Sequence, residues 1–239
     1  IFVQNAEVPE LKDAIKKGAF IKVKGKTTVD AFDHDLTVMS VWGIKKITDF
    51  RTGRQDTSPV KRVELHCHTK MSDMDGVTDA ARLVQRAYEW GHPAIAITDH
   101  GVVQSFPEAN HAIEAIDGAY RKKYQAEHPD ATKDELKKVS APFKVIYGME
   151  GYVFDDADCV QEDGSIDYKS KPTHHIIILA KTQEGLKNIY KLVSYSHLDY
   201  YYKKPRLPWS VIEANREGLI IGSACSAGEV FSSMVKHVT

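Results

Sequence analysis

Histidine and carboxylate side chains recur in this sequence where strands are expected to end. His66 and His68 are separated by one residue, so in an extended chain both side chains point the same way. Asp99 and His100 follow the apolar run at residues 94–98, which is typical of a strand buried on both faces. In parallel α/β folds, functional groups gather at the C-terminal ends of the strands. The same edge is predicted to receive three further candidates: Asp75, Glu150 and Cys225.

Imidazole and carboxylate groups at one sheet edge suit a divalent metal ion such as Zn²⁺, Mn²⁺ or Fe²⁺. A bridging carboxylate, for which Glu150 is the candidate, holds two such ions close together. A cluster of this kind activates water and binds a phosphate oxygen, which favours hydrolysis of a phosphoester. Each residue alone has a simpler explanation, since a strand-end histidine is often only hydrogen-bonded and Cys225 alone would be a small buried apolar residue. The sequence has no glycine-rich phosphate loop, no G-x-S-x-G motif and no C-x-x-C pair, so a metal site is the main chemical hypothesis.

Strands and helices are predicted to alternate from residue 61 onward. Thr78 is a plausible N-cap, Gly91 a plausible helix end, and Thr132 with Glu135 has the sequence of a capping box. The alternation favours parallel βα units, either in an open sheet or in a barrel. The predicted strands cover residues 63–66, 94–98, 144–147, 176–179 and 219–221, and the predicted helices lie near residues 83–88, 107–123 and 184–195.

The first sixty residues have a different pattern. Residues 20–25 alternate apolar and basic side chains, which indicates a half-buried strand. With residues 28–32 and 36–42 they predict an antiparallel meander, of the kind that forms part of a small barrel. The polar stretch at residues 49–59 predicts a linker.

The composition is that of a globular protein without a strong electrostatic preference. Of the 239 residues 42% are hydrophobic and 27% charged, and the net charge of −1 gives no overall attraction to nucleic acid. The apolar stretch at residues 176–180 is too short to span a bilayer, so we expect no membrane partner. The N-terminus does not have the pattern of a signal peptide, and three cysteines cannot pair fully, which together predict a cytoplasmic protein.

Two longer motifs carry a family resemblance. HCHTKMSDMDG at residues 66–76 and GHPAIAITDHG at residues 91–101 closely resemble the polymerase-and-histidinol-phosphatase (PHP) domain. Further segments are similar to the PolC-type DNA polymerase III family, namely residues 102–109, 144–150, 185–188 and 217–225.

The resemblance implies a site and a fold. It implies a cluster of up to three divalent ions, with Zn²⁺ expected ahead of Mn²⁺ or Fe²⁺. Asp99 is expected to orient His100 or a nearby ligand. The strand-end argument does not find His175, which begins a predicted strand. The implied fold is α/β, a distorted and here incomplete (βα)7 barrel at residues 61–239. The implied ligands are His66, His68, Asp75, His100, Glu150, His175 and Cys225.

The resemblance also assigns residues 1–60 to the later strands of an OB fold and a linker. Lys22, Lys24 and Trp42 are then candidates for contact with a nucleic-acid strand, with Phe20 and Phe32 beside them. An alternative explanation is that the aromatic residues fill a barrel core and the lysines are merely solvated.

Family members carry an exonuclease domain inserted in the PHP domain, whereas residues 155–172 here are only a polar loop. The chain also stops before the family's last metal-binding motif. The implied function is that of a fragment of a replicative DNA polymerase, whose partners are the rest of the polymerase chain, DNA, dNTPs and replisome proteins. The alternatives are a free-standing PHP phosphoesterase and a structural module without metal.

Overall fold

The computed structural model describes residues 18–32, 34–51, 53–157, 159–161 and 167–236. Predictions for residues 1–17, and for part of the 155–172 loop, lie outside the described residues. The chain divides into two compact units between Gln55 and Asp56, inside the predicted linker.

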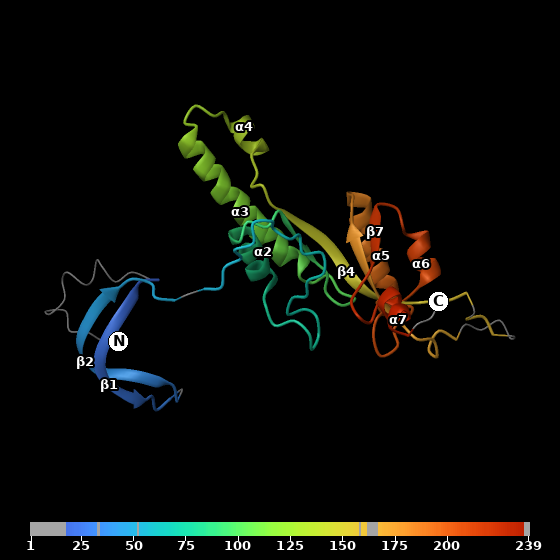
Figure 1. The fold of residues 1–239 in the computed structure, drawn as a ribbon, viewed down its shortest axis with the longest axis horizontal. Helices are drawn as coiled ribbons and strands as arrows, with labels where there is room; N and C mark the ends of the chain where they lie inside the picture. Colours follow the sequence, from blue (N-terminus) through green and yellow to red (C-terminus); the bar gives the residue numbers. More distant parts are fainter. Residues whose placement is uncertain (1–17, 33, 52, 158, 162–166, 237–239) are drawn as a thin grey trace. The chain divides into compact units, whose positions relative to one another are not determined.

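The first unit is a hairpin of β1 (Phe20–Val29) and β2 (Leu36–Ile47), which pair antiparallel (Figure 1). The prediction of two strands within residues 20–32 is wrong, because β1 continues past Gly25 with a shift in register. A Cβ at Gly25 would lie 2.6 Å from Val38 Cγ1, so glycine permits the close approach of the two strands there. Every described residue of this unit is at least partly exposed, and its membership of an OB fold stays a prediction.

A five-stranded mixed sheet forms the centre of the second unit. Its strands are β3 (Ala94–Ile97), β4 (Lys144–Phe154), β5 (His174–Ala180), β6 (Arg206–Pro208) and β7 (Leu219–Ser223). The order is β3-β4-β5-β7, and β6 pairs with β4. β3 and β6 run parallel to β4, whereas β5 runs antiparallel to β4 and β7 antiparallel to β5. The prediction of parallel βα units is therefore wrong for β5, which runs against β3, β4, β6 and β7.

The helices of the second unit largely follow the sequence signals. Thr132 and Glu135 form the predicted capping box, with hydrogen bonds in both directions. The first of these helices begins after Asp79 rather than Thr78, and Gly91 beyond its end has φ +76°. The helices are α2 (Ala80–Glu89), α3 (Phe106–Glu127), α4 (Lys133–Lys138), α5 (Gln183–Leu198), α6 (Trp209–Ala214) and α7 (Glu229–Val235).

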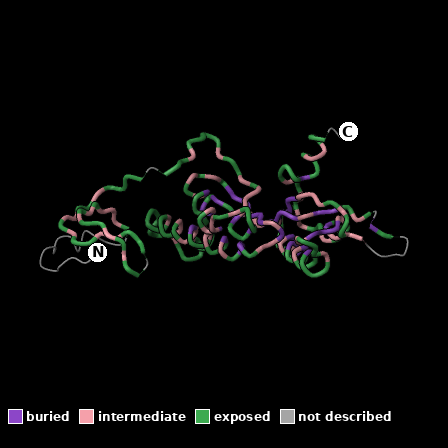
Figure 2. The backbone as a smooth tube through the Cα atoms, turned by 90° about the horizontal axis from the view of Figure 1, so that it is seen from below, coloured by how far each residue is buried: buried purple, intermediate pink, exposed green. Residues whose placement is uncertain are grey.

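Two main hydrophobic cores lie along β4. One packs α2 and α3 against β3 and the start of β4, through residues such as Val84 and Ile95. The other packs α5 and α6 against β5, β6 and the later part of β4, through residues such as Ile178 and Leu192. β4 runs from the α2 and α3 side to the α5 and α6 side (Figure 1). Among the described residues, the buried ones all belong to the second unit (Figure 2). Each fully buried aliphatic side chain contributes about 1.5–3 kcal/mol.

The segment before the first histidines is not a full strand. Of the predicted strand at residues 63–66, only Glu64 makes an isolated parallel bridge, with Ile95, and its carbonyl oxygen accepts from Ala96 N at 2.7 Å. This contact holds the approach to His66 alongside β3. Among the described residues, no helix has the length and apolar character needed to cross a membrane.

Candidate metal centre

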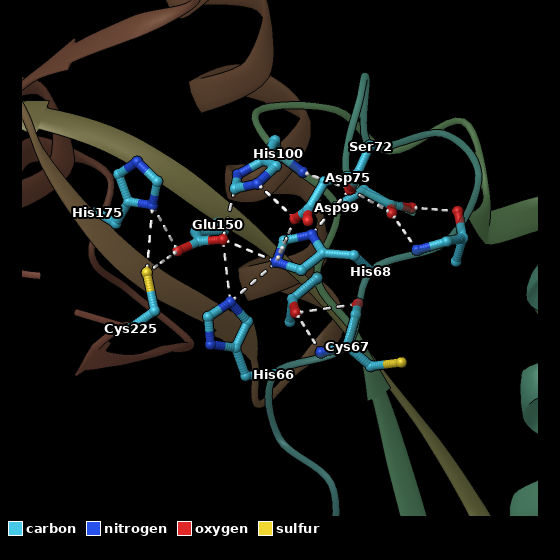
Figure 3. Close-up of polar contacts among 12 residues, drawn as sticks. His66, Cys67, His68, Ser72, Asp75, Asp99, His100, Glu150, His175 and Cys225 are labelled. Carbon is cyan, nitrogen blue, oxygen red and sulfur yellow. Dashed lines mark hydrogen bonds and ion pairs between the residues drawn. The ribbon is translucent and has the colours of Figure 1, made fainter. Parts of the chain in front are cut away.

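Glu150 lies at the centre of a cluster of imidazoles (Figure 3). Its side chain is fully buried, and β4 continues four residues beyond it rather than ending there as predicted. Its Oε2 atom lies 2.9 Å from the Nε2 atoms of both His66 and His68 and 3.1 Å from His100 Nδ1. Its Oε1 atom lies 2.9 Å from His175 Nδ1. One carboxylate thus contacts four histidines from three parts of the chain.

His66 and His68 turn toward the same point, as their spacing predicts. Their Nε2 atoms are 3.0 Å apart. The residue between them is fixed to the end of β3, because Cys67 N donates to Thr98 Oγ1 at 2.9 Å and Thr98 N donates to Cys67 O at 2.9 Å. The Cys67 thiol points away from the cluster (Figure 3), and burial, with the charges of Glu64 and Asp99, raises its pKa to about 11. Cys67 is therefore not a ligand candidate.

Asp75 lies on the side of the centre next to His100. Its Oδ2 atom lies 3.0 Å from His100 Nε2 and 3.8 Å from His68 Nε2. The loop that carries it turns sharply at Gly76, where a Cβ would lie 1.9 Å from Thr69 O. This loop requires glycine at position 76, because any larger residue would collide with the backbone.

His175 and Cys225 reach the centre from β5 and the end of β7. Cys225 Sγ lies 3.5 Å from His175 Nδ1 and 3.6 Å from Glu150 Oε1. His175 stands at the start of β5, opposite Tyr152 of β4. Because β5 is antiparallel to β4, the beginning of β5 meets the same region of the sheet that the end of a parallel strand would reach. The strand-end argument missed His175 for this reason.

Asp99 organises the loop behind His68. It is fully buried and accepts from Thr69 N at 2.6 Å, Thr69 Oγ1 at 2.9 Å, Ser72 Oγ at 2.8 Å and Ser105 Oγ at 2.5 Å. Ser72 Oγ in turn lies 2.8 Å from His68 Nδ1. Asp99 therefore acts on His68 through Ser72. It acts on His100 only through the backbone, because His100 N donates to Ser72 Oγ at 3.1 Å.

This arrangement fixes the tautomer of His68. The Ser72 hydroxyl has one proton, which it donates to Asp99 Oδ1. It must then accept from His68 Nδ1–H, so the Nε2 atom of a neutral His68 carries a lone pair. That lone pair faces Glu150 Oε2, itself an acceptor, at 2.9 Å. Two acceptors at this distance require a cation between or beside them, either a proton on His68 or a bound metal ion.

The electrostatics keep Glu150 ionised. Burial raises the pKa of Glu150, but hydrogen bonds from His175, His68 and His66 outweigh burial and hold the pKa well below its usual range. An ionised carboxylate among imidazoles and a thiol is a donor set that suits Zn²⁺, Mn²⁺ or Fe²⁺. Three overlapping groups have the spacing to hold an ion: His66 with His68 and Glu150, His68 with Asp75 and His100, and His100 with Glu150 and His175. The residues present therefore fit a divalent cation.

Comparison with known proteins assigns the chain to a family. Residues 64–237 match the sequence model of the PHP domain. The chain belongs to the PHP domain family. All seven candidate ligands lie inside the matched residues, whereas the hairpin that carries Lys22, Lys24 and Trp42 lies outside them.

The chain is also similar, over nearly its whole length, to much longer proteins. The DNA polymerase III PolC-type of Clostridium perfringens is 28% identical over 404 aligned residues, which cover 100% of this chain and 28% of that protein. The corresponding proteins of Pediococcus pentosaceus and Bacillus subtilis are 26% and 25% identical, over 98% and 99% of this chain and 28% of each relative. Because 404 aligned positions exceed the 239 residues of this chain, at least 165 positions of the Clostridium protein have no counterpart here.

A solved structure from Bifidobacterium adolescentis, described as a proposed metal-dependent phosphoesterase, is 19% identical with a TM-score of 0.33. The similar part covers 58% of this chain and 34% of the Bifidobacterium chain. A TM-score this low carries no argument about function.

Sequence reasoning missed two residues that support the candidate ligands. Ser72 lies within the first motif but receives no role from residue type alone, because a serine in a loop is usually solvated. Its spacing of four residues from His68 is the signal that could have indicated a contact. Ser105, which begins no motif and is nearly fully buried, gives no such signal.

Proposed function

We propose that the PHP centre binds two or three divalent ions, with Zn²⁺ expected first and Mn²⁺ or Fe²⁺ as the alternatives. The observation that carries this proposal is the approach of four imidazole nitrogens to the fully buried Glu150 carboxylate, at 2.9 to 3.1 Å. The two oxygens of Glu150 face different histidines, which suits a carboxylate that bridges ions. The proposed ligands are His66, His68, Asp75, His100, Glu150, His175 and Cys225.

Such a centre supports hydrolysis of a phosphoester. When bound, the ions would supply a Lewis acid for a phosphate oxygen and lower the pKa of a coordinated water. The chain's own contribution is orientation, because Ser72 and Asp99 keep the proton of His68 on Nδ1 and leave Nε2 free to bind. Burial of Glu150 excludes bulk water from the middle of the centre.

Metal analysis together with an ester assay tests this proposal. We expect the purified chain to hold two or three equivalents of metal and to hydrolyse a chromogenic phosphoester in a metal-dependent way. His68→Ala and Glu150→Ala should lose metal and lower the melting temperature, because the remaining ligands become clustered polar groups without compensation. Glu213→Ala, which removes an exposed carboxylate, is the control. Less than one equivalent of metal in the wild type, or unchanged metal and melting in both ligand variants, would contradict the metal centre.

At the level of the whole protein, we propose that this chain is part of a cytoplasmic replicative DNA polymerase of the PolC type. The similarity to three such polymerases over at least 98% of the chain supports this proposal. The PHP domain would then support a polymerase that extends a primer with dNTPs, in contact with the rest of its chain, DNA and replisome proteins. Its sheet would be part of a distorted (βα)7 barrel.

We place the 165 or more missing positions in the connection between β4 and β5, as an absent exonuclease insertion. Val153 and His174, at the two ends of this connection, are register partners. A domain inserted here would leave and return at neighbouring points, so the sheet would not need to change.

A free-standing PHP phosphoesterase is the competing function. It would need the same metal centre but no further domains, so the ester assay cannot separate the two. The length of the encoding reading frame does separate them, because a stop codon near position 239 contradicts the polymerase proposal.

The hairpin is a candidate contact for a nucleic-acid strand. Lys22 lies directly opposite Lys45 across the two strands, and Lys24 follows on the same face. Like charges in this position repel each other, so a bound polyanion would stabilise the pair. Trp42 lies between Met39 and Gly43, where the register of the two strands shifts, so strand alternation assigns it to neither face. Lys22→Glu with Lys45→Glu should abolish binding of a labelled single strand in fluorescence anisotropy, and unchanged binding would contradict this contact.

A further inference from the structure

Lys204 stands at the border of the metal centre. Its Nζ atom lies 4.2 Å from the centre of the Tyr152 ring. Tyr152 follows Glu150 by two residues on β4, so both side chains leave the same face of the strand. The Tyr152 ring is stacked against His100, with centroids 5.7 Å apart, and stands edge-on to His175 at 4.9 Å. The ammonium group is therefore separated from two ligand candidates by one aromatic ring.

A second contact fixes the segment that carries Lys204. Pro205 packs against Gly101, where a Cβ would lie 2.5 Å from Pro205 Cγ. Gly101 directly follows His100, so the segment is held beside the centre at two separate points. Lys203 has a left-handed backbone, with φ 61°, and this turn separates the exposed Lys203 from the half-buried Lys204. A strained conformation for a lysine is consistent with a fixed position for the residue that follows it.

The charge around Lys204 is not balanced by the described residues. Among them, no carboxylate lies within ion-pair distance of its Nζ atom, whereas Lys61 and Lys70 each pair with an aspartate. The neighbouring cation, Arg206, donates to the carbonyl oxygens of Lys169 and Lys171 and also has no acidic partner among the described residues. A half-buried ammonium beside a second cation favours an anion that enters from solvent.

We propose that Lys204 binds a non-bridging oxygen of the substrate's phosphoryl group and positions that group at the metal centre. This inference rests on the proposed phosphoesterase function, and it adds a residue that the metal ligands do not include. The Tyr152 ring holds the ammonium in place by a cation–π contact, which leaves its N–H groups free to donate. The shared chemistry is a phosphate with at least one charged, non-bridging oxygen, which both monoesters and diesters supply.

Binding of inorganic phosphate to the Zn²⁺-loaded chain tests this role without catalysis. Lys204→Met keeps the apolar stem on Tyr152 and removes the charge, so we expect phosphate to bind about tenfold more weakly in calorimetry, because one charge-assisted hydrogen bond is lost. Lys204→Arg should stay within about threefold of the wild type. Lys203→Met is the matched control, because its ammonium lies over Tyr202 rather than Tyr152, and it should leave the affinity unchanged. Bound zinc should be the same in all four proteins.

Three results would overturn the role of Lys204: equal phosphate affinity in Lys204→Met and Lys203→Met, loss of zinc from Lys204→Met, or no phosphate binding by the wild type. Ester assays identify the substrate. We expect Lys204→Met to raise KM for p-nitrophenyl phosphate, for bis(p-nitrophenyl) phosphate or for both, with a smaller change in kcat, and the responding ester shows whether monoesters or diesters are bound. If the wild type binds phosphate through Lys204 but hydrolyses neither ester, the phosphoesterase function fails while the phosphate contact stands.

Discussion

The two sides of the metal centre are built in different ways. On the Asp99 side, His68 is held by Ser72, which is held by a fully buried carboxylate with four donors. On the Cys225 side, the thiol is exposed, and it lies 3.5 Å from His175 Nδ1 and 3.6 Å from Glu150 Oε1. Cys225 follows β7, an edge strand whose Ile220 is 51% exposed. Glu150 contacts both sides.

This difference indicates how each side would bind an ion. Ligands whose orientation is fixed in advance lose little entropy on binding, so the Asp99 side should bind metal tightly. Ligands on an exposed edge must be ordered when the ion arrives, so the Cys225 side should bind more weakly and exchange faster.

The largest effect is expected when the Asp99 carboxylate behind His68 is removed. Asp99→Ala leaves Thr69 N and the hydroxyls of Ser72 and Ser105 buried without an acceptor. We expect the free energy of unfolding to fall by about 3–4 kcal/mol even without metal, because each unpaired buried donor carries its own cost. Urea denaturation of the metal-free protein measures this. Asp73→Ala, in the same loop but exposed, should change stability by less than about 0.5 kcal/mol, and an equal loss in both variants would contradict the buried network.

A smaller change removes only the link between Asp99 and His68. Ser72→Ala frees the His68 ring to adopt the other tautomer, so we expect affinity for the first Zn²⁺ ion to fall about 10–100-fold. Competition with a chelating dye gives the affinity. Ser194→Ala is a suitable control, because Ser194 bonds only to a carbonyl within its own helix. Equal zinc affinity in Ser72→Ala and the wild type would show that the tautomer of His68 is not set by Ser72.

The smallest effect is expected on the Cys225 side. Cys225→Ser should weaken only the last ion to bind, by a few-fold to about tenfold, and leave the tightest affinity unchanged. Alkylation of the wild type provides an independent reading, because bound metal should protect Cys225 from a maleimide while Cys67 and Cys159 stay slow for reasons of burial. If zinc does not slow the labelling of Cys225, the thiol does not bind the ion.

The two sides of the centre also differ in how far the sequence predicts them. His66, His68 and His100 come from short motifs next to β3, and local spacing was enough to bring them together. His175 depends on the direction of β5, which is set by long-range pairing with β4 and leaves no local signal. The predicted strand at residues 63–66 is reduced to one bridge at Glu64, because tertiary contacts outweigh strand propensity there. Ser72 supports the centre because it contacts both His68 and Asp99. Its residue type alone does not predict these two contacts.

The two hydrophobic cores along β4 give the metal centre a further consequence for folding. His66 and His100 belong to the part of the chain that packs with α2 and α3, whereas His175 belongs to the part that packs with α5 and α6. Glu150 lies on the strand shared by both. An ion held by ligands from both parts would couple their unfolding into one cooperative transition, and without it the two cores would be free to melt one after the other. In that sense the metal would determine how many cooperative folding units this stretch of chain contains.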